Sequence, residues 1–130
     1  MAIAIGLLSV PAAADHSILV IASKQSPLIS LTREEVADIF LGRSTSMVRW
    51  RPIDSSDEGL RDQFYEALAG ISANRARARW ARLVFSARLT PPREMPAEPA
   101  IAAVTREDMG ITYVFREQAP RDARVLLVLP

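Results

Sequence analysis

Hydroxyl side chains and one arginine are the residues of this 130-residue sequence best suited to holding a small ligand. Ser26 lies in a polar loop after an apolar segment. Ser55 and Ser56 follow a second such segment, and Arg61 comes shortly after them. Hydroxyls donate hydrogen bonds and a guanidinium pairs with anions, and ligands of open α/β sheets bind in the loops at the carboxyl ends of strands. We therefore predict that these four residues form a ligand-binding site.

The same segment also has a purely structural interpretation. The two serines and Asp57 suit a turn and a helix N-cap, and Arg61 can form an ion pair with Asp57 or Asp62. Asp57 and Glu58 are adjacent carboxylates, which are capable of acid–base or metal chemistry. Adjacent acids in a first helical turn more often stabilise the helix dipole. The sequence leaves the ligand-binding and capping interpretations open.

A second candidate site is an arginine stripe on a predicted helix. Arg75, Arg79 and Arg82 recur at helical spacing beside Trp80. Cationic side chains with an aromatic ring can bind a phosphate backbone and stack on bases, which makes nucleic acid or another polyanion a candidate ligand. The alternative is a solvated basic face, with Trp80 packed in the core.

The residue types required for several kinds of catalysis are missing from the sequence. There is no cysteine, and the single histidine, His16, lies near the N-terminus. No arrangement of nucleophile, base and orienting group can be assembled from what remains. The formal net charge of +1 is too small to attract nucleic acid or anionic lipid to the whole molecule. We predict that the protein is not an enzyme and has no catalytic residue, cofactor or metal site.

The elements that would position these residues begin with a strand and a helix. Ser17–Ala22 is a continuous apolar run, typical of a central strand buried on both faces of a parallel sheet. Thr32 and Glu35 have the spacing of a capping box, which predicts a helix start at this point. Gly42 is expected to end that helix.

Further strands and helices are predicted along the middle of the chain. Val48–Ile53 reads as a short strand, and Asp54–Asp57 as a turn that starts a second helix, which Gly70 ends. Ser72 is expected to cap a third helix. The buried stripe of this third helix is predicted to contain Ala76, Trp80, Leu83 and Val84.

The last third of the sequence supplies the remaining elements. Thr90–Pro99 contains four prolines and is predicted to be an extended connector. A short helix is expected at 100–105, followed by strands at 111–115 and Arg124–Leu129. Strands that alternate with helices predict an α/β fold, with a mostly parallel sheet covered by helices on both faces.

The first fourteen residues have the character of a secretory signal. An apolar run, Ile3–Leu8, is followed by a proline and three small residues, Ala12–Ala14. The run is too short to span a bilayer. No Lys or Arg precedes it, so either the true start lies upstream or the signal is degenerate; the alternative is a buried first strand. We predict a signal peptide at 1–14, a single exported domain at 15–130 and a periplasmic location.

Several segments together resemble a family of transport proteins. Leu31–Gly42, followed by a strand containing Trp50, resembles the periplasmic substrate-binding proteins of phosphate ABC importers. Three further segments resemble the family in the same order: Gly59–Tyr65, Trp80–Phe85 and Ile111–Val114. The resemblance covers residues 17–130 and is greatest to a short, single-lobe branch. It implies one lobe of a type 2 periplasmic-binding-protein-like fold.

The sequence departs from this family at the anion site. In full-length relatives an arginine and a Ser-Gly-Thr turn hold the anion at the start of a helix, where free backbone amides face it. Here Asp54 falls at the position of the arginine, and the turn reads Glu58-Gly59-Leu60. Asp57 and Glu58 place two negative charges at that helix start, so we predict a degenerate phosphate site.

Together these features predict an extracytoplasmic module that is either solute-binding-like or engaged in protein interaction. The resemblance implies a small anion or a protein as partner, and an ABC importer as the membrane component. We expect no nucleic acid partner and no stable membrane anchor. The alternative is binding of a polyanion or nucleic acid through the face formed by Arg75, Arg79 and Arg82.

Overall fold

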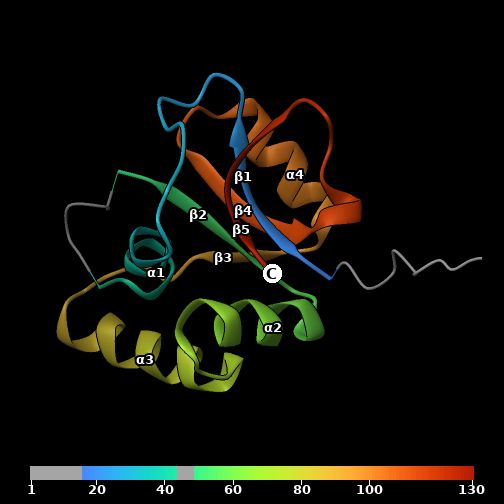
Figure 1. The fold of residues 1–130 in the computed structure, drawn as a ribbon. Coiled ribbons are helices and arrows are strands. Elements are labelled where there is room, and N and C mark those ends of the chain that lie inside the picture. The colour runs from blue at the N-terminus through green and yellow to red at the C-terminus, as the bar shows by residue number, and fades with distance from the viewer. Residues whose placement is uncertain (1–15, 44–48) are drawn as a thin grey trace, which may run out of the picture.

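The computed structural model describes residues 16–43 and 49–130. In chain order its elements are β1 (Ile18–Ser23), α1 (Arg33–Leu41), β2 (Arg51–Ser55), α2 (Glu58–Ala69), α3 (Ala73–Ser86), β3 (Arg93–Met95), α4 (Ala97–Arg106), β4 (Gly110–Phe115), the 3-10 turn η3 (Arg116–Gln118) and β5 (Ala123–Leu129) (Figure 1). The predicted alternation of strands and helices is confirmed. The proposed signal segment, residues 1–14, lies outside the described residues.

The strands form one sheet in the order β3-β2-β4-β1-β5. Strands β2, β3, β4 and β5 all run in the same direction, because β2 is parallel to β3 and β4 while β1 is antiparallel to both β4 and β5. The prediction of a mostly parallel sheet is thus confirmed. β1 is buried along its whole length, as predicted, but it runs opposite to its neighbours. Helices covering both faces bury a strand in either direction, so its apolar run could not reveal the direction.

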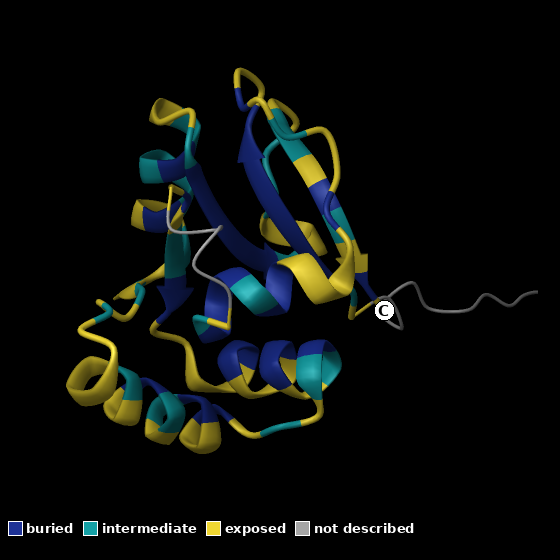
Figure 2. Cartoon of the chain, turned by 90° about the vertical axis from the view of Figure 1, so that its left-hand side faces the viewer, coloured by how far each residue is buried: buried dark blue, intermediate teal, exposed yellow. Residues whose placement is uncertain are grey.

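Helices cover both faces of the sheet, as predicted. β1 shows how: Ile18 and Val20 pack into the larger core with α1 and α2, whereas Leu19 and Ile21 pack with Val104 of α4. α3 lies outside this arrangement and packs on α2 and α1 (Figure 1). Figure 2 shows the buried residues concentrated in the sheet and on the helix faces turned toward it.

The helix boundaries follow the capping residues that the sequence contains. Thr32 and Glu35 form the predicted capping box, and Gly42 ends α1 with a φ of 63°. Asp57 caps α2 and Ser72 caps α3, each by accepting hydrogen bonds from backbone N–H groups. Gly70 ends α2 with a φ of 68°. All of these helix starts and ends are therefore confirmed.

Three local expectations need correction. The strand expected at Val48–Ile53 begins instead at Arg51, and its first predicted residue lies outside the described residues. The connector Thr90–Pro99 contains the edge strand β3 and the first residues of α4. Val84 is 40% exposed, because α3 packs on other helices and its buried residues, Ala73, Ala76 and Trp80, all lie in its first half. In the described residues, no helix is long and apolar enough to cross a membrane.

Candidate functional site

The serines predicted to share a site lie at two opposite edges of the sheet. Ser55 is the last residue of β2, so Ser55 and Ser56 lie at the carboxyl edge, as expected. Ser26 lies in the loop after β1, and β1 runs the other way, with Ser23 paired to the first residue of β5. The expectation that Ser26 lies at the carboxyl edge is therefore wrong. The structure brings together only Ser55, Ser56 and Arg61.

Ser26 is occupied by the internal bonds of its own loop. Its Oγ accepts a hydrogen bond from the backbone N–H of Leu28 at 3.1 Å. Arg124 donates to the carbonyl oxygens of Ser26 and Leu28 at 2.8 and 2.7 Å, and to that of Lys24. Because Ser26 is also buried, it has a stabilising role in this loop.

The backbone N–H groups around the start of α2 donate hydrogen bonds to other groups of the same chain. Asp57 Oδ1 accepts from the backbone N–H groups of Gly59 and Leu60 at 3.0 and 3.2 Å. Ser55 Oγ accepts from the N–H of Asp57, and the N–H of Ser56 donates to the carbonyl oxygen of Met95. The amides of Gly59 and Leu60, which could otherwise bind an anion, are thus already paired with a carboxylate.

Arg61 is buried beneath this helix start and lies between two carboxylates. It is only 4% exposed, and its Nη2 lies 3.4 Å from Asp54 Oδ2. Its Nη1 lies 2.8 Å from Glu94 Oε2 on β3. Burial lowers the pKa of Arg61, but the charges of Asp54 and Glu94 outweigh it and raise the pKa above its ordinary value. Arg61 is therefore a charged, internally neutralised residue.

The fit between Arg61 and its carboxylates is incomplete. Nε and Nη1 are buried and have no hydrogen-bond partner of suitable geometry, although Nη1 is close to Glu94. The sequence suggested Asp57 or Asp62 as the ion-pair partner of Arg61. In the structure its partners are instead Asp54 of β2 and Glu94 of the neighbouring strand β3.

Two tyrosines complete the environment of Asp54, which is 1% exposed. Tyr65 of α2 donates its hydroxyl to Asp54 Oδ2 at 2.8 Å, and Tyr113 of β4 donates to Oδ1. The N–H of Ser55 also donates to Oδ1 at 2.9 Å. Burial and the nearby charge of Asp54 raise the pKa of both tyrosine hydroxyls well above the ordinary value. The carboxylate thus accepts hydrogen bonds from residues of three elements, β2, α2 and β4.

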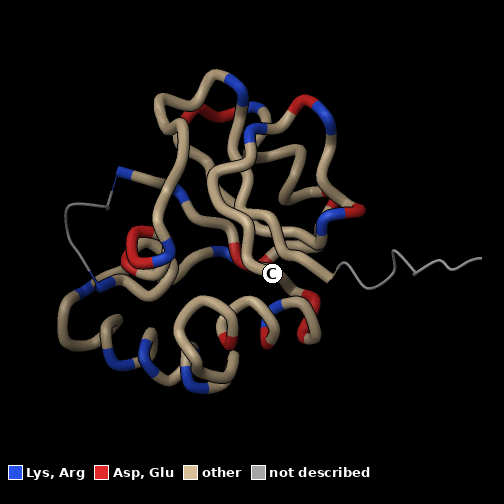
Figure 3. Tube along the Cα trace, viewed as in Figure 1, with Lys and Arg blue, Asp and Glu red and all other residues tan. Residues whose placement is uncertain are grey.

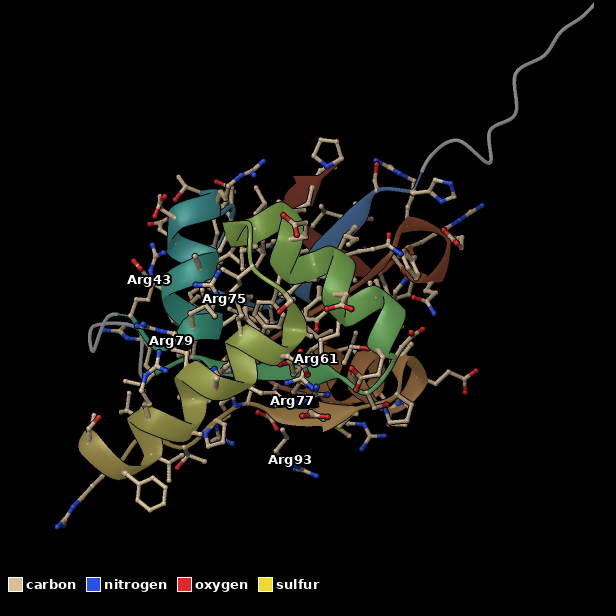
Figure 4. All side chains as sticks on the ribbon, turned by 90° about the horizontal axis from the view of Figure 1, so that it is seen from below. Arg43, Arg61, Arg75, Arg77, Arg79 and Arg93 are labelled. Carbon is tan, nitrogen blue, oxygen red and sulfur yellow. The ribbon has the colours of Figure 1, made fainter. Side chains whose placement is uncertain are left out.

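The charged residues continue outward as an alternating series. Arg77 of α3 lies 2.5 Å from Glu58 Oε2, and its Nε lies 3.9 Å from Glu94. Figure 4 shows Arg61 and Arg77 close together, with Arg93 pointing away from them. We call Asp54, Arg61, Glu94, Arg77 and Glu58 the charge network. Each cation in it faces a carboxylate of the same chain, so neither is free to attract a ligand anion.

The sequence contained part of the signal for this network. The acids at 54, 57 and 58 pointed to a helix start without free positive charge. The roles of Tyr65, Tyr113 and Glu94 were missed, because they depend on how β3 and β4 flank β2. A tyrosine in an otherwise apolar strand needs a polar partner when buried, which is the one local clue that Tyr113 offered.

The arginine stripe of α3 is divided between two environments. Arg79 Nε donates to the carbonyl oxygen of Leu41 at 2.7 Å, beside a bond of 2.8 Å from Trp80 Nε1 to that of Phe40. These two residues thus donate hydrogen bonds to backbone carbonyl oxygens at the carboxyl end of α1. Arg75 and Arg82 are exposed, and Figure 3 shows the basic residues of α3 without acidic ones among them. The predicted basic face is thus reduced, with one of its three arginines used internally.

Comparison with known proteins shows similarity of fold. No family model matches the chain, and no curated protein matches it. An ABC-type phosphate transport receptor from Vibrio cholerae superposes with a TM-score of 0.62 at 11% identity, over 85% of this chain and 45% of the receptor. A putative phosphate ABC transporter substrate-binding protein from Clostridium perfringens, with bound phosphate, gives 0.63 at 18% identity, over 85% and 44%.

These matches define the class of fold. The chain spans less than half the length of either structure, and it has the architecture of a single lobe of a type 2 periplasmic-binding-protein-like fold. This confirms the fold class predicted from the sequence.

Proposed function

We propose that this chain is an extracytoplasmic binding module of the substrate-binding-protein type, in which the chain's own carboxylates occupy the phosphate position. The fold similarity to phosphate-binding transport proteins supports a binding role over a catalytic one. The observation that carries the proposal is that buried Arg61 forms ion pairs with Asp54 and Glu94. The neighbouring start of α2 is capped by Asp57.

The electrostatic cost of bringing phosphate to this edge is large. At 4 Å and an effective dielectric constant of about 20, one pair of like charges costs about 4 kcal/mol. Asp54 and Glu94 flank Arg61, and Asp57 caps the adjacent helix start, so the single charge of Arg61 offsets only one of these three carboxylates. The module therefore interacts with a protein partner or with a solute other than phosphate, and an ABC importer is the membrane component that the fold similarity favours.

Native mass spectrometry of the chain purified from a periplasmic fraction tests this proposal. We expect the chain to carry no phosphate after mixing with inorganic phosphate at about 100 μM. An adduct of one phosphate that persists through desalting would contradict the proposal. The two-lobed substrate-binding protein from Clostridium perfringens, which holds phosphate in its structure, is the positive control.

A second candidate function, binding of a polyanion, rests on one observation. α3 carries four arginines and no acidic residue, and Arg75 and Arg82 are exposed on it. Binding of heparin or single-stranded DNA should then fall steeply with added salt, because bound counterions are released. Arg75→Gln with Arg82→Gln should abolish such binding. If binding is absent at low salt, this second function is excluded.

A further inference from the structure

A cavity lies at the amino ends of β2 and β3, at the edge of the sheet opposite the charge network. Its volume is about 540 Å³, within the range of small-molecule sites. It lies between the carboxyl end of α1, the segment that follows α3, and α4. Its apolar lining includes Ile39, Trp50, Trp80, Leu89, Pro91 and Pro92. Two indole rings and two proline rings form a surface suited to a flat apolar body.

The charges around this cavity leave a net attraction for anions. Its two acidic residues are already paired: Asp38 accepts from Arg43 Nε at 3.1 Å, and Glu107 lies 3.4 Å from Arg51. Arg88 and Arg93 also line it, and among the described residues neither has an ion-pair partner. Two guanidinium groups are thus available at the rim to pair with a carboxylate.

The backbone at Arg88 supports a role for this side chain. Its φ is 56°, the one positive value outside glycine in the described residues. α3 ends here with bonds from the N–H groups of Ala87 and Leu89 to the carbonyl oxygen of Leu83. Glycine is the residue that such a helix end favours. An arginine held in this strained conformation at a cavity rim is the pattern expected where function opposes stability.

We propose that this cavity binds a small amphipathic carboxylate, with its apolar body against Trp50 and Trp80 and its carboxylate facing Arg88 and Arg93. Inorganic phosphate lacks the apolar body, and a neutral apolar molecule lacks the partner for the two arginines. The site is separate from the charge network, so it stands whether or not phosphate is excluded there.

Intrinsic fluorescence is a direct readout of this cavity, because Trp50 and Trp80 are the two tryptophans of the chain and both line it. Three probes are titrated at low salt: 3-phenylpropionate, its neutral amide 3-phenylpropanamide, and inorganic phosphate. We expect a saturable change with the carboxylate, binding of the amide weaker by roughly tenfold, and no change with phosphate. Equal binding of carboxylate and amide, a response to phosphate, or no response to any probe would overturn the proposal.

Variants separate the site from general effects on folding. Arg88→Gly removes the charge and relieves the strained backbone, so we expect an unchanged or higher melting temperature together with roughly tenfold weaker carboxylate binding. Arg93→Gln should weaken binding similarly. Arg75→Gln is the matched control, since Arg75 is an exposed arginine of α3 outside the cavity. If Arg75→Gln weakens binding as much as Arg88→Gly, the proposal fails.

Discussion

Asp54 links the two buried tyrosines to the buried arginine at the carboxyl edge of the sheet. Its carboxylate accepts hydrogen bonds from Tyr65 and Tyr113 and faces the guanidinium of Arg61. In a buried environment these partners are needed for the charge to be tolerated at all. The same arrangement pairs the cation that would otherwise attract an anionic ligand, so the proposed absence of phosphate binding and the stability of this buried group have one physical cause.

Replacing Asp54 by asparagine should destabilise the protein strongly. Among the described residues the change leaves Arg61 buried with one close carboxylate, that of Glu94, and we expect a loss of about 3 kcal/mol in the free energy of unfolding. Urea denaturation measures it. Glu107→Gln is the control, because its pair with Arg51 is exposed and should contribute less than about 1 kcal/mol. Similar losses for the two variants would show that the buried ion pair contributes no more to the free energy of unfolding than the exposed one.

Alkaline unfolding should be governed by the two buried tyrosines. Both pKa values are raised in the folded state, by burial first and then by Asp54, so folding keeps both hydroxyls protonated. The unfolded chain releases these protons above pH ~10 and the folded chain does not, so stability is fully present below that pH and falls as the pH rises.

The measurement is an alkaline titration followed by phenolate absorbance and circular dichroism. Tyr65 and Tyr113 are the only tyrosines and Lys24 the only lysine, so few other groups titrate in this window. Phenolate should appear together with the loss of folded signal. Phenolate appearing in the folded protein near pH 10 would contradict the buried arrangement.

At the scale of elements, α3 stabilises the fold through its first half. Trp80 packs into the interior and donates to the carbonyl oxygen of Phe40, and Arg79 donates to that of Leu41. A Cβ on Gly42 would lie 2.7 Å from the Trp80 ring, so α1 and α3 approach closely at this point. The second half of α3 exposes Val84 and Phe85.

Alanine substitutions at the two aromatic residues of α3 should differ sharply. Trp80→Ala removes a buried ring and a hydrogen bond and should cost about 3 to 5 kcal/mol of unfolding free energy. Phe85→Ala should change it by less than about 0.5 kcal/mol, because Phe85 is 88% exposed. Thermal or denaturant unfolding of both variants checks this. Equal effects would mean that the packing face of α3 is assigned wrongly.

The elements were predictable where local chemistry determines them. The capping box at Thr32, the caps at Asp57 and Ser72, and the glycines after α1 and α2 marked helix ends correctly. The strand β3 was hidden among prolines, since its pairing with β2 is a long-range property. The direction of β1, and with it the position of Ser26, depends on topology that a buried apolar run does not encode.

The candidate site was only partly predictable for the same reason. Asp57 acts locally, so its capping role could be read from the sequence. The partners of Arg61 come from β2 and β3, and those of Asp54 from α2 and β4. Such contacts follow from the order of the strands and become visible only when the sheet is assembled.

At the scale of the whole molecule, the proposed location outside the cytoplasm is testable independently of ligand binding. The apolar segment at residues 1–14 should be removed on export, because it has the character of a secretory signal. N-terminal sequencing of the chain from a periplasmic fraction is expected to begin near Asp15. A chain that retains Met1 and is found in the cytoplasm would contradict the proposed export.

The proposal that the chain's own carboxylates occupy the phosphate position predicts that inorganic phosphate does not bind. Titration calorimetry with inorganic phosphate at neutral pH and low salt tests it most directly, because electrostatic effects are then least screened. We predict no saturable heat at phosphate concentrations up to about 1 mM, corresponding to less than about 4 kcal/mol of binding free energy. A saturable isotherm tighter than about 10 μM requires about 7 kcal/mol. If such an isotherm is unchanged in Arg88→Gly, which leaves the charge network intact, the claim is contradicted.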